Sequence, residues 1–244
     1  MNPPALISKE IKPMNILVID VGGTNVKVRA TSHDQLLKIP SGPKLTAARM
    51  VEAVLAGIAG WEYEAITIGY PGLVVHGNIA SDPHNLGAGW VGFDFKNAFQ
   101  QPVKIINDAA MQALGSYEGG SMLFLGLGTG MGAAMIADGI LEPMELAHLP
   151  YKKGRTYEEY TGLAGLERMG KSKWTRHVTD IVNLLKNALE ADYVVLGGGN
   201  AELLKELPDG ARLGDNANAF VGGCRLWDKD FSQVKPAVTL ETPQ

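Results

Sequence analysis

Three glycine-rich segments could bind phosphate, because each follows a run of apolar residues that is typical of a strand. They are Gly22-Gly23-Thr24, Gly126-Leu127-Gly128-Thr129-Gly130 and Gly197-Gly198-Gly199. A turn without side chains exposes backbone N–H groups, which bind phosphate oxygens. A tight hairpin turn would explain any one of these segments equally well, but three of them on one chain favour a phosphate ligand. A Rossmann-type site is excluded, because the GxGxxA pattern at 128–133 continues into AAMIADG, a strand and hairpin turn instead of a helix.

Asp20 ends a predicted buried strand directly before the first glycine turn. A carboxylate at that place repels phosphate unless a cation lies between them, and we expect magnesium, bound to Asp20 through water. The alternative is a turn residue that bonds its own backbone. Lys27 is either a counter-charge for phosphate or a solvated lysine on a strand.

The best candidate for a catalytic base is Asp108, which follows Asn107 where a strand over 103–106 gives way to a helix. An ionised carboxylate there could take the proton from a hydroxyl group that attacks a terminal phosphoryl group. We expect the helix N-terminus to keep Asp108 ionised. Capping of the helix by Asn107 or Asp108 is the alternative role for this pair.

A set of polar residues could hold the hydroxyl groups of a sugar. Glu145 and His148 are three residues apart and share a face if their segment is helical. Together with Glu158 and Asn107 they could bind several hydroxyl groups in fixed geometry. The rival is a transition-metal site, for which one histidine with scattered carboxylates is a poor set of ligands.

The pattern of apolar residues predicts the elements that position these side chains. Strands are expected on both sides of the first two glycine loops, at 65–70, at 103–106 and before the third glycine loop, with helices over 46–58, 158–169 and 178–189, a helix from 108 closed by Gly119 and Gly120, and a short helix from Asn200 to Pro208. The strand, glycine turn, strand module occurs twice. We therefore predict a loosely ordered leader (1–14), an N-terminal α/β domain (15–110) and a C-terminal α/β domain (111–244), with a cleft between the domains.

The composition describes a soluble globular chain of 244 residues, 45% hydrophobic and 20% charged, with a net charge of −4. A single cysteine, Cys224, favours a reducing compartment. No apolar stretch approaches the roughly 18 residues of a membrane span. No basic block suggests a general nucleic-acid binder. We expect a cytoplasmic protein that binds neither membranes nor nucleic acid.

Five motifs in the same order resemble the ROK family of sugar kinases. They are DVGGTNVK (Asp20–Lys27), IGYPG (Ile68–Gly72), NDA (Asn107–Ala109), GLGTGMG (Gly126–Gly132) and LGGGN (Leu196–Asn200). The resemblance implies the two-domain α/β fold of actin, hexokinase and Hsp70, which is ribonuclease H-like, with an interdomain cleft for nucleotide and sugar. It also makes a homodimer the expectation.

The resemblance assigns roles residue by residue. The first phosphate loop is implied to be Asp20, Gly22, Gly23, Thr24 and Lys27, the second Gly128, Thr129 and Gly130, and the border of the adenosine Gly197, Gly198 and Gly199. Asn107 is implied to bind a sugar hydroxyl and Asp108 to be the base. The family's ExGH motif falls on Glu145–His148, and its final sugar-binding glutamate on Glu158.

The chain departs from the ROK pattern in ways that resemble one branch of the family. ROK kinases usually carry a cysteine cluster for zinc after the ExGH histidine, and HLPYKKGRTYEEY contains none of these cysteines, so zinc is not implied. The missing cluster, a short segment before the third glycine loop and the KSKW sequence (Lys171–Trp174) resemble the polyphosphate glucokinases, which accept polyphosphate, often beside ATP. Six basic residues could bind that donor, or could be a solvated basic stretch: Lys152, Lys153, Arg155, Lys171, Lys173 and Arg176.

The resemblance therefore implies a magnesium-dependent kinase that forms glucose 6-phosphate from glucose with polyphosphate or ATP. One alternative is a strictly ATP-dependent kinase for mannose, fructose or an N-acetylated aminosugar. Another is a non-catalytic sugar sensor, because ROK proteins include repressors with an N-terminal helix-turn-helix domain, for which we expect the first fourteen residues to be too short.

Overall fold

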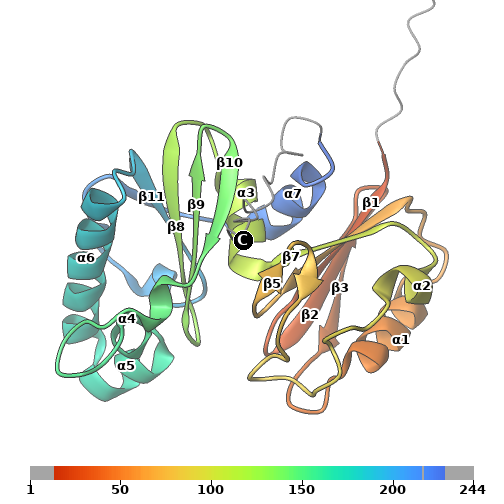
Figure 1. Cartoon of the computed structure of the whole chain (residues 1–244), viewed down its shortest axis with the longest axis horizontal. Coiled ribbons are helices and arrows are strands. Elements are labelled where there is room, and N and C mark those ends of the chain that lie inside the picture. Colours follow the sequence, from red (N-terminus) through yellow and green to blue (C-terminus); the bar gives the residue numbers. More distant parts are fainter. Residues whose placement is uncertain (1–13, 216, 229–244) are drawn as a thin grey trace, which may run out of the picture.

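The computed structural model describes residues 14–215 and 217–228, which form two large sheets with covering helices (Figure 1). The first sheet has five strands in the order β3-β2-β1-β4-β7. These are β1 (Ile16–Val21), β2 (Asn25–Ala30), β3 (His33–Pro40), β4 (Ala65–Tyr70) and β7 (Val103–Asn107). β1 pairs antiparallel with β2 and parallel with β4. Every residue of β1 and β4 is buried, as expected for central strands that are covered on both faces.

The second sheet repeats this plan in the order β10-β9-β8-β11-β12. Its strands are β8 (Ser121–Leu127), β9 (Met131–Ala137), β10 (Ile140–Met144), β11 (Tyr193–Gly197) and β12 (Ala211–Leu213). β8 pairs antiparallel with β9 and parallel with β11, as β1 does with β2 and β4. The predicted duplication of a strand, glycine turn, strand module is therefore present in both sheets. A small hairpin of β5 (Val74–Val75) and β6 (Asn78–Ile79) accompanies the first sheet.

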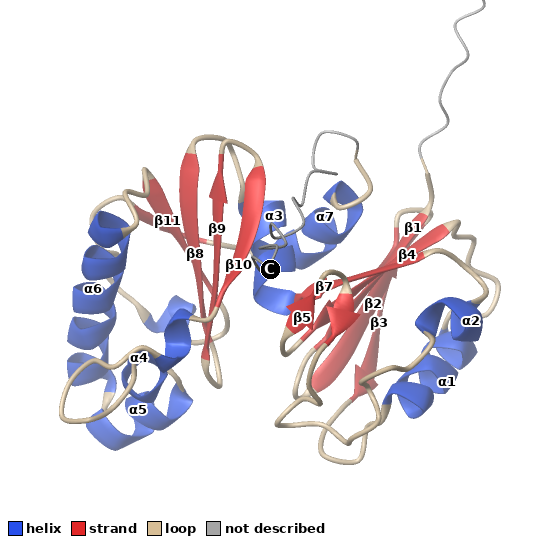
Figure 2. Ribbon diagram, in the orientation of Figure 1, coloured by secondary structure: helices blue, strands red, loops and turns tan. Residues whose placement is uncertain are grey.

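Helices cover the outer side of each sheet (Figure 2). The first sheet carries α1 (Ala47–Gly57) and α2 (Phe95–Phe99). The second carries η1 (Leu146–His148), α4 (Tyr157–Thr161), α5 (Leu163–Met169), α6 (Lys171–Ala188) and η2 (Ala201–Leu203). α1 begins where predicted because the side chain of Thr46 accepts a hydrogen bond from the backbone of Arg49.

Two helices, α3 (Asp108–Ser116) and α7 (Asn218–Arg225), lie between the sheets (Figure 1). One hydrophobic cluster joins them to strands of both sheets, with Val18 of β1 on one side and Phe124 of β8 on the other. The two helices approach closely at glycines, because a Cβ at Gly115 would meet the backbone of α7 and a Cβ at Gly222 the backbone of α3. The sheets therefore share one apolar core through α3 and α7.

α7 is fastened to the first sheet although it comes last in the described chain. The buried hydroxyl of Thr67 on β4 donates to the carbonyl of Gly223 at 2.7 Å and accepts from the indole of Trp227 at 2.9 Å. Lys104 on β7 donates to the carbonyl of Leu226 at 2.8 Å. The sheets separate at α3, close to the predicted boundary at 110/111, but α7 returns across that boundary, and the division into domains remains a prediction.

The structure corrects three helix predictions. The helix expected over 158–169 is two helices, because Gly162 between them has an extended backbone. The helix expected from 178 begins seven residues earlier, at Lys171, and buries Trp174 in its first turns. The helix expected from Asn200 is a single 3-10 turn, since the side chain of Asn200 donates to the carbonyl of Gly128 instead of capping it.

Within residues 14–215 and 217–228, no helix combines the length and the apolar character that a membrane crossing requires. The predicted leader, Met14 apart, lies outside the described residues.

Candidate active site

Asp108 lies where β7 passes into α3, as predicted. Asn107 caps this helix, because its side-chain oxygen accepts a hydrogen bond from the backbone of Ala110 at 3.1 Å. The side-chain nitrogen of Asn107 donates to the carbonyl of Gly72 at 3.1 Å. The capping alternative therefore holds for Asn107, whose side chain keeps one N–H for a ligand. Asp108 is not needed as the cap.

The first turn of α3 is held between the two sheets. A Cβ at Gly69 on β4 would collide with the side chain of Met111 and touch the Cα atom of Asp108 at 3.8 Å, and a Cβ at Gly132 on β9 would lie 2.7 Å from the Cβ atom of Ala109. Glycine at both positions allows this close approach. Asp108 is therefore at the junction of the sheets, where the sequence placed it.

The environment of Asp108 suits a base that works near neutral pH. Burial, and then the charge of Asp20, raise the pKa of Asp108 from 3.8 to about 7, while a hydrogen bond from the backbone of Ala109 opposes the shift. Glu145 contributes a smaller rise. Desolvation thus outweighs the helix N-terminus, which was expected to keep Asp108 ionised, and the raised pKa leaves this carboxyl group partly ionised near neutral pH. A carboxyl group with this pKa accepts a proton more readily than an ordinary aspartate does.

Asp20 and Lys27 form an ion pair beside the first glycine loop. They are opposite each other on β1 and β2, and 3.6 Å separates Lys27 Nζ from Asp20 Oδ2. Burial raises the pKa of Asp20, and the charge of Lys27 opposes this shift. The side chain of Lys27 is 35% exposed, so its ammonium group can also reach a ligand. The loop itself is a tight turn, closed by a hydrogen bond from Gly22 N to Asn25 O at 3.1 Å.

The second and third glycine loops meet each other. They leave the ends of the adjacent parallel strands β8 and β11, where Gly126 is opposite Gly197. The backbone of Asn200 donates to the carbonyl of Leu127 at 3.0 Å. Gly198 has a φ of +81°, and a Cβ there would strike the backbone of Leu127. Two loops at the carboxyl ends of parallel strands form the usual place for a ligand in open α/β sheets.

Glu158 lies against the second glycine loop. Its carboxylate accepts a hydrogen bond from the backbone of Met131 at 3.2 Å, and a Cβ at Gly130 would collide with it. A capping box of Thr156 and Glu159 fixes the start of α4, on which Glu158 is carried. The structure therefore brings this candidate to the second glycine loop.

Glu145 and His148 lie at the 3-10 turn η1 and face solvent. Glu145 Oε2 is 4.0 Å from His148 Nε2, and the two side chains are 59% and 71% exposed. A single helical turn brings them to one side, as the spacing predicted. The effect of Glu145 on the pKa of Asp108 places its carboxylate within electrostatic range of that residue.

Sequence reasoning missed the loop over 81–92, which lies over the first glycine loop. One carboxylate oxygen of Asp82 accepts hydrogen bonds from the backbone of Gly89 at 3.1 Å and of Trp90 at 2.9 Å. These bonds lower the pKa of Asp82. A Cβ at Gly23 would lie 3.8 Å from the Cβ atom of Asn85, so Asn85 borders the first glycine loop. The segment has no periodic pattern, and its Pro, Asp and Gly residues indicated only a loop.

Residues 165–172 read GLERMGKS and fit the P-loop pattern GxxxxGK[ST]. A P-loop follows a strand. Here the segment runs along α5 into α6, so it is not a phosphate loop of that kind.

The surroundings of Asp20 suit Mg²⁺, which is held largely by water, better than a metal ion that is held by protein ligands alone. Mg²⁺ usually keeps several waters and takes one or two carboxylates besides the phosphate oxygens of its substrate. Asp20 supplies one buried carboxylate next to the first glycine loop. Over 14–215 and 217–228, no three His, Cys, Asp or Glu side chains gather as ligands of one metal ion.

Comparisons with known proteins agree with this architecture. The model of the ROK family matches residues 16–143. A polyphosphate glucokinase of Mycobacterium tuberculosis (strain CDC 1551 / Oshkosh) is 29% identical over 205 residues, which cover 74% of this chain and 76% of the relative. The inorganic polyphosphate/ATP-glucomannokinase of Arthrobacter sp. strain KM superposes with a TM-score of 0.73 at 24% identity, covering 86% of this chain and 97% of that one. A ROK family glucokinase from Streptomyces griseus, solved with glucose and AMPPNP, gives 0.69 at 16% identity, covering 87% and 98%. The likeness confirms the predicted actin- and hexokinase-like fold.

Proposed function

The chain belongs to the ROK family, and on this premise we propose that it is a sugar kinase that transfers a terminal phosphoryl group from polyphosphate or ATP to the 6-hydroxyl of glucose. The observation that carries the proposal is the position of Asp108. This carboxyl group lies between the two sheets, with a pKa raised to about 7, in electrostatic contact with Asp20 beside the first phosphate loop.

The reaction requires little covalent chemistry from the protein. The sugar oxygen attacks the terminal phosphorus, its proton passes to the Asp108 carboxylate, and the bond from phosphorus to the bridging oxygen of the donor breaks. The backbone N–H groups of the glycine loops are suited to bind the phosphate oxygens, on which charge collects in the transition state. Thr129 and the neighbouring glycines of the second loop, together with Gly23 and Thr24 of the first, are the residues proposed for this role.

Asp20 would hold magnesium through water, next to the ion pair with Lys27. When bound, the metal neutralises charge on the transferring phosphate. Lys27 adds a second positive charge from the protein, since it is partly exposed beside the first loop. We infer that Lys27 contacts the donor phosphate, which is the counter-charge role among the two alternatives that the sequence left open.

We propose that the sugar is bound by Asn107, Asp108, Glu145, His148 and Glu158. Asn107 offers its remaining N–H, while Glu145 and His148 are open to solvent at η1. Glu158 already has one hydrogen bond to the second glycine loop and can accept others from hydroxyl groups. The names of the relatives, a polyphosphate glucokinase and a polyphosphate/ATP-glucomannokinase, support glucose as the acceptor.

The basic stretch supports polyphosphate as a donor. The backbone of Leu163, at the start of α5, donates to the carbonyl of Gly128 at 3.0 Å, so α5 begins at the second phosphate loop. At the other end of α5, Lys171 and Lys173 are exposed at the start of α6. Helix N-termini favour anions. Lys152, one of the six basic residues, is less available to a donor, because its ammonium group pairs with Asp180 Oδ2 at 3.4 Å.

For ATP, we propose that Gly197, Gly198 and Gly199 border the adenosine. They leave β11 next to the second phosphate loop, so a nucleotide whose phosphates bind at Gly128 would have its adenosine nearby. A cytoplasmic homodimer remains the expected state of the protein.

The test is a comparison of Asp108→Asn with the matched control Asp209→Asn, whose exposed aspartate is in the loop before β12. Sugar phosphate formation should fall by at least about 100-fold in Asp108→Asn and stay at wild-type level in the control. Glucose binding by calorimetry should survive in both variants. Retained activity in Asp108→Asn would refute the proposed base. Sugar binding without turnover in the wild-type protein would instead favour the non-catalytic sensor.

A further inference from the structure

The proposed sugar site is divided between two segments of the second half of the chain. Glu145 and His148 are at η1, and Glu158 follows on α4. Because Glu145 and His148 are mostly exposed, their location depends on the backbone that carries them. The connection over 149–157 therefore decides how far apart the two segments are.

This connection is folded back on itself. Pro150 and Thr156 form an isolated antiparallel bridge. The backbone of Tyr151 donates to Arg155 O at 2.8 Å, and that of Tyr157 donates to Leu149 O at 3.1 Å. The two ends of the connection are thereby held side by side, with the residue after His148 bonded to the first residue of α4.

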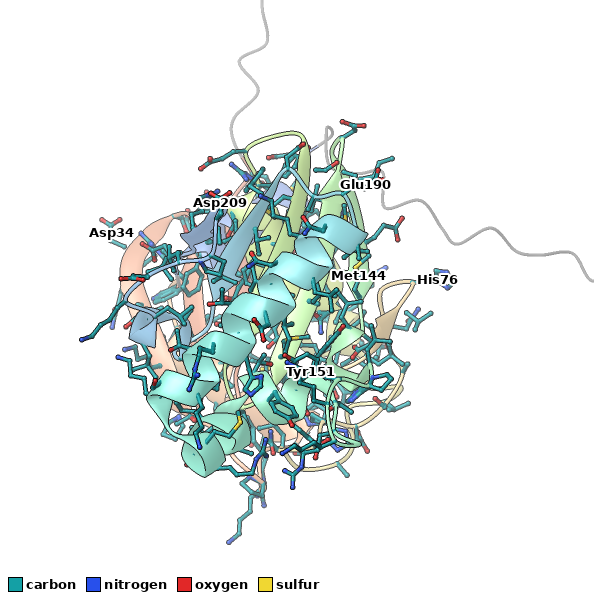
Figure 3. The ribbon with its side chains drawn as sticks, turned by 90° about the vertical axis from the view of Figure 1, so that its left-hand side faces the viewer. Asp34, His76, Met144, Tyr151, Glu190 and Asp209 are labelled. Carbon is teal, nitrogen blue, oxygen red and sulfur yellow. The ribbon has the colours of Figure 1, made fainter. Side chains whose placement is uncertain are left out.

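The side chain of Tyr151 packs this connection against α4 and α6. Its ring lies 5.5 Å from that of Tyr157, 5.0 Å from that of Tyr160 and 5.7 Å from that of His177 on α6. Tyr160 and His177 also meet edge to face, with centroids 4.6 Å apart. Figure 3 looks onto α6 and shows Tyr151 beside this helix. The four rings form one cluster between the connection, α4 and α6, which we name the Tyr151 cluster.

The hydroxyl of Tyr151 adds polar contacts to the same helix. It lies 3.2 Å from His177 Nδ1 and 3.3 Å from Asp180 Oδ2. Burial, followed by the charge of Lys152, lowers the pKa of His177, which favours the neutral ring, and one nitrogen of a neutral ring can accept a hydrogen bond. Lys152 completes the arrangement, because its ammonium group contacts Asp180 and lies 4.7 Å from the centre of the Tyr151 ring.

We propose that Tyr151, held by His177 and Asp180 on α6, is a positioning residue that sets the spacing between Glu145–His148 and Glu158. α6 is an 18-residue helix with an apolar face buried against the second sheet, and so provides a fixed reference. Loss of the Tyr151 contacts would let the connection move and separate the two halves of the sugar site. The inference rests on the proposed function, and adds to it residues that do not touch the sugar.

The test compares four variants with wild type and a matched control. Tyr151→Phe keeps the ring and removes the hydroxyl, and Tyr151→Ala removes both. His177→Ala removes the partner, while His177→Asn keeps a polar atom near the position of Nδ1. The control is Tyr193→Phe, which removes a hydroxyl that bonds Glu118 N at 3.0 Å, at the opposite end of β11 from the third glycine loop.

Tyr151→Phe and His177→Ala should each raise the KM for glucose about two- to tenfold, while the KM for the donor and kcat change little. Tyr151→Ala should raise it further, and His177→Asn should recover much of the loss. The double variant Tyr151→Phe/His177→Ala should have a KM for glucose close to that of the single variant with the higher KM, because both changes remove the same contact. The control should match wild type in the KM for glucose.

Two failures can be told apart. If the wild-type protein phosphorylates no hexose, the proposed function is refuted, and this inference falls with it. If wild type is active and Tyr151→Phe and His177→Ala keep its KM for glucose, only the positioning role is refuted. Equal effects on the KM for glucose and the KM for the donor would also overturn it, since they would indicate a general loss of structure.

Discussion

The replacement Asp108→Asn should stabilise the protein while it removes activity. Asparagine keeps the shape of the side chain and its oxygen, which can still accept the hydrogen bond from Ala109 N, seen at 2.8 Å in the native protein. The variant loses only the charge. In the folded protein that charge is unfavourable, because burial and the neighbouring Asp20 raise the pKa of Asp108 to about 7.

The size and pH range of the effect follow from this shift. A rise from 3.8 to about 7 corresponds to about 4 kcal/mol, at about 1.36 kcal/mol per pKa unit. Solvent reaches part of the Asp108 side chain and screens it, so we expect a gain of about 1–3 kcal/mol. Because the folded protein binds the proton more tightly than the unfolded chain, wild-type stability falls as pH rises from about 4 to about 7. The gain in the variant is therefore complete above about pH 7 and vanishes below about pH 4.

Urea unfolding of both proteins at about pH 5 and about pH 8 measures this difference. The Asn variant should be the more stable protein at the higher pH, by a smaller margin at the lower pH, and should lose at least about 100-fold in turnover. The control Asp209→Asn should show neither change. Equal or lower stability of Asp108→Asn at the higher pH would refute the reasoning, because it would mean that the native carboxylate is not desolvated.

Four further predictions concern the site. Wild-type kcat/KM should rise with pH to a plateau, with a midpoint near the Asp108 pKa of about 7, and a midpoint near 4 would exclude Asp108 as the base. Glu158→Gln should raise the KM for glucose about tenfold at constant KM for the donor, and an unchanged affinity for glucose by calorimetry would remove Glu158 from the sugar site. Lys171→Ala/Lys173→Ala should raise the KM for polyphosphate and leave that for ATP unchanged; equal effects on both donors would return these lysines to the solvated surface. Gly198→Ala should lower stability by about 1–3 kcal/mol in urea unfolding, since its φ is +81°, and a wild-type value would contradict the close contact with Leu127.

The parts of the site that depend on residues adjacent in the sequence could be predicted. A glycine turn after a buried strand and an Asn-Asp pair at the start of a helix are local features, so Asp20 and Asp108 lie where expected. The pKa of Asp108 could not be predicted, because it depends on Asp20 and Glu145, which come from other elements. The pairing of Lys27 with Asp20 required the register of β1 and β2.

Contacts between distant segments explain the remaining differences. Gly162 breaks the helix predicted over 158–169, and a Cβ at Gly162 would lie 2.7 Å from the carbonyl oxygen of Thr129, in the second glycine loop. α7 returns to the first sheet through Thr67 and Gly223, which are 156 residues apart. β3 was missed because its residues are exposed or only half-buried, so the alternation of apolar and polar residues is weak.

The most direct test of the central claim is formation of sugar 6-phosphate by the purified chain. Glucose, mannose, fructose and an N-acetylated aminosugar would each be supplied with magnesium and one donor, either polyphosphate or ATP. We predict that glucose is converted to glucose 6-phosphate with polyphosphate, and also with ATP. Activity with ATP alone would keep the kinase and remove the role proposed for Lys171 and Lys173. No product with any pair of sugar and donor would contradict the proposed activity.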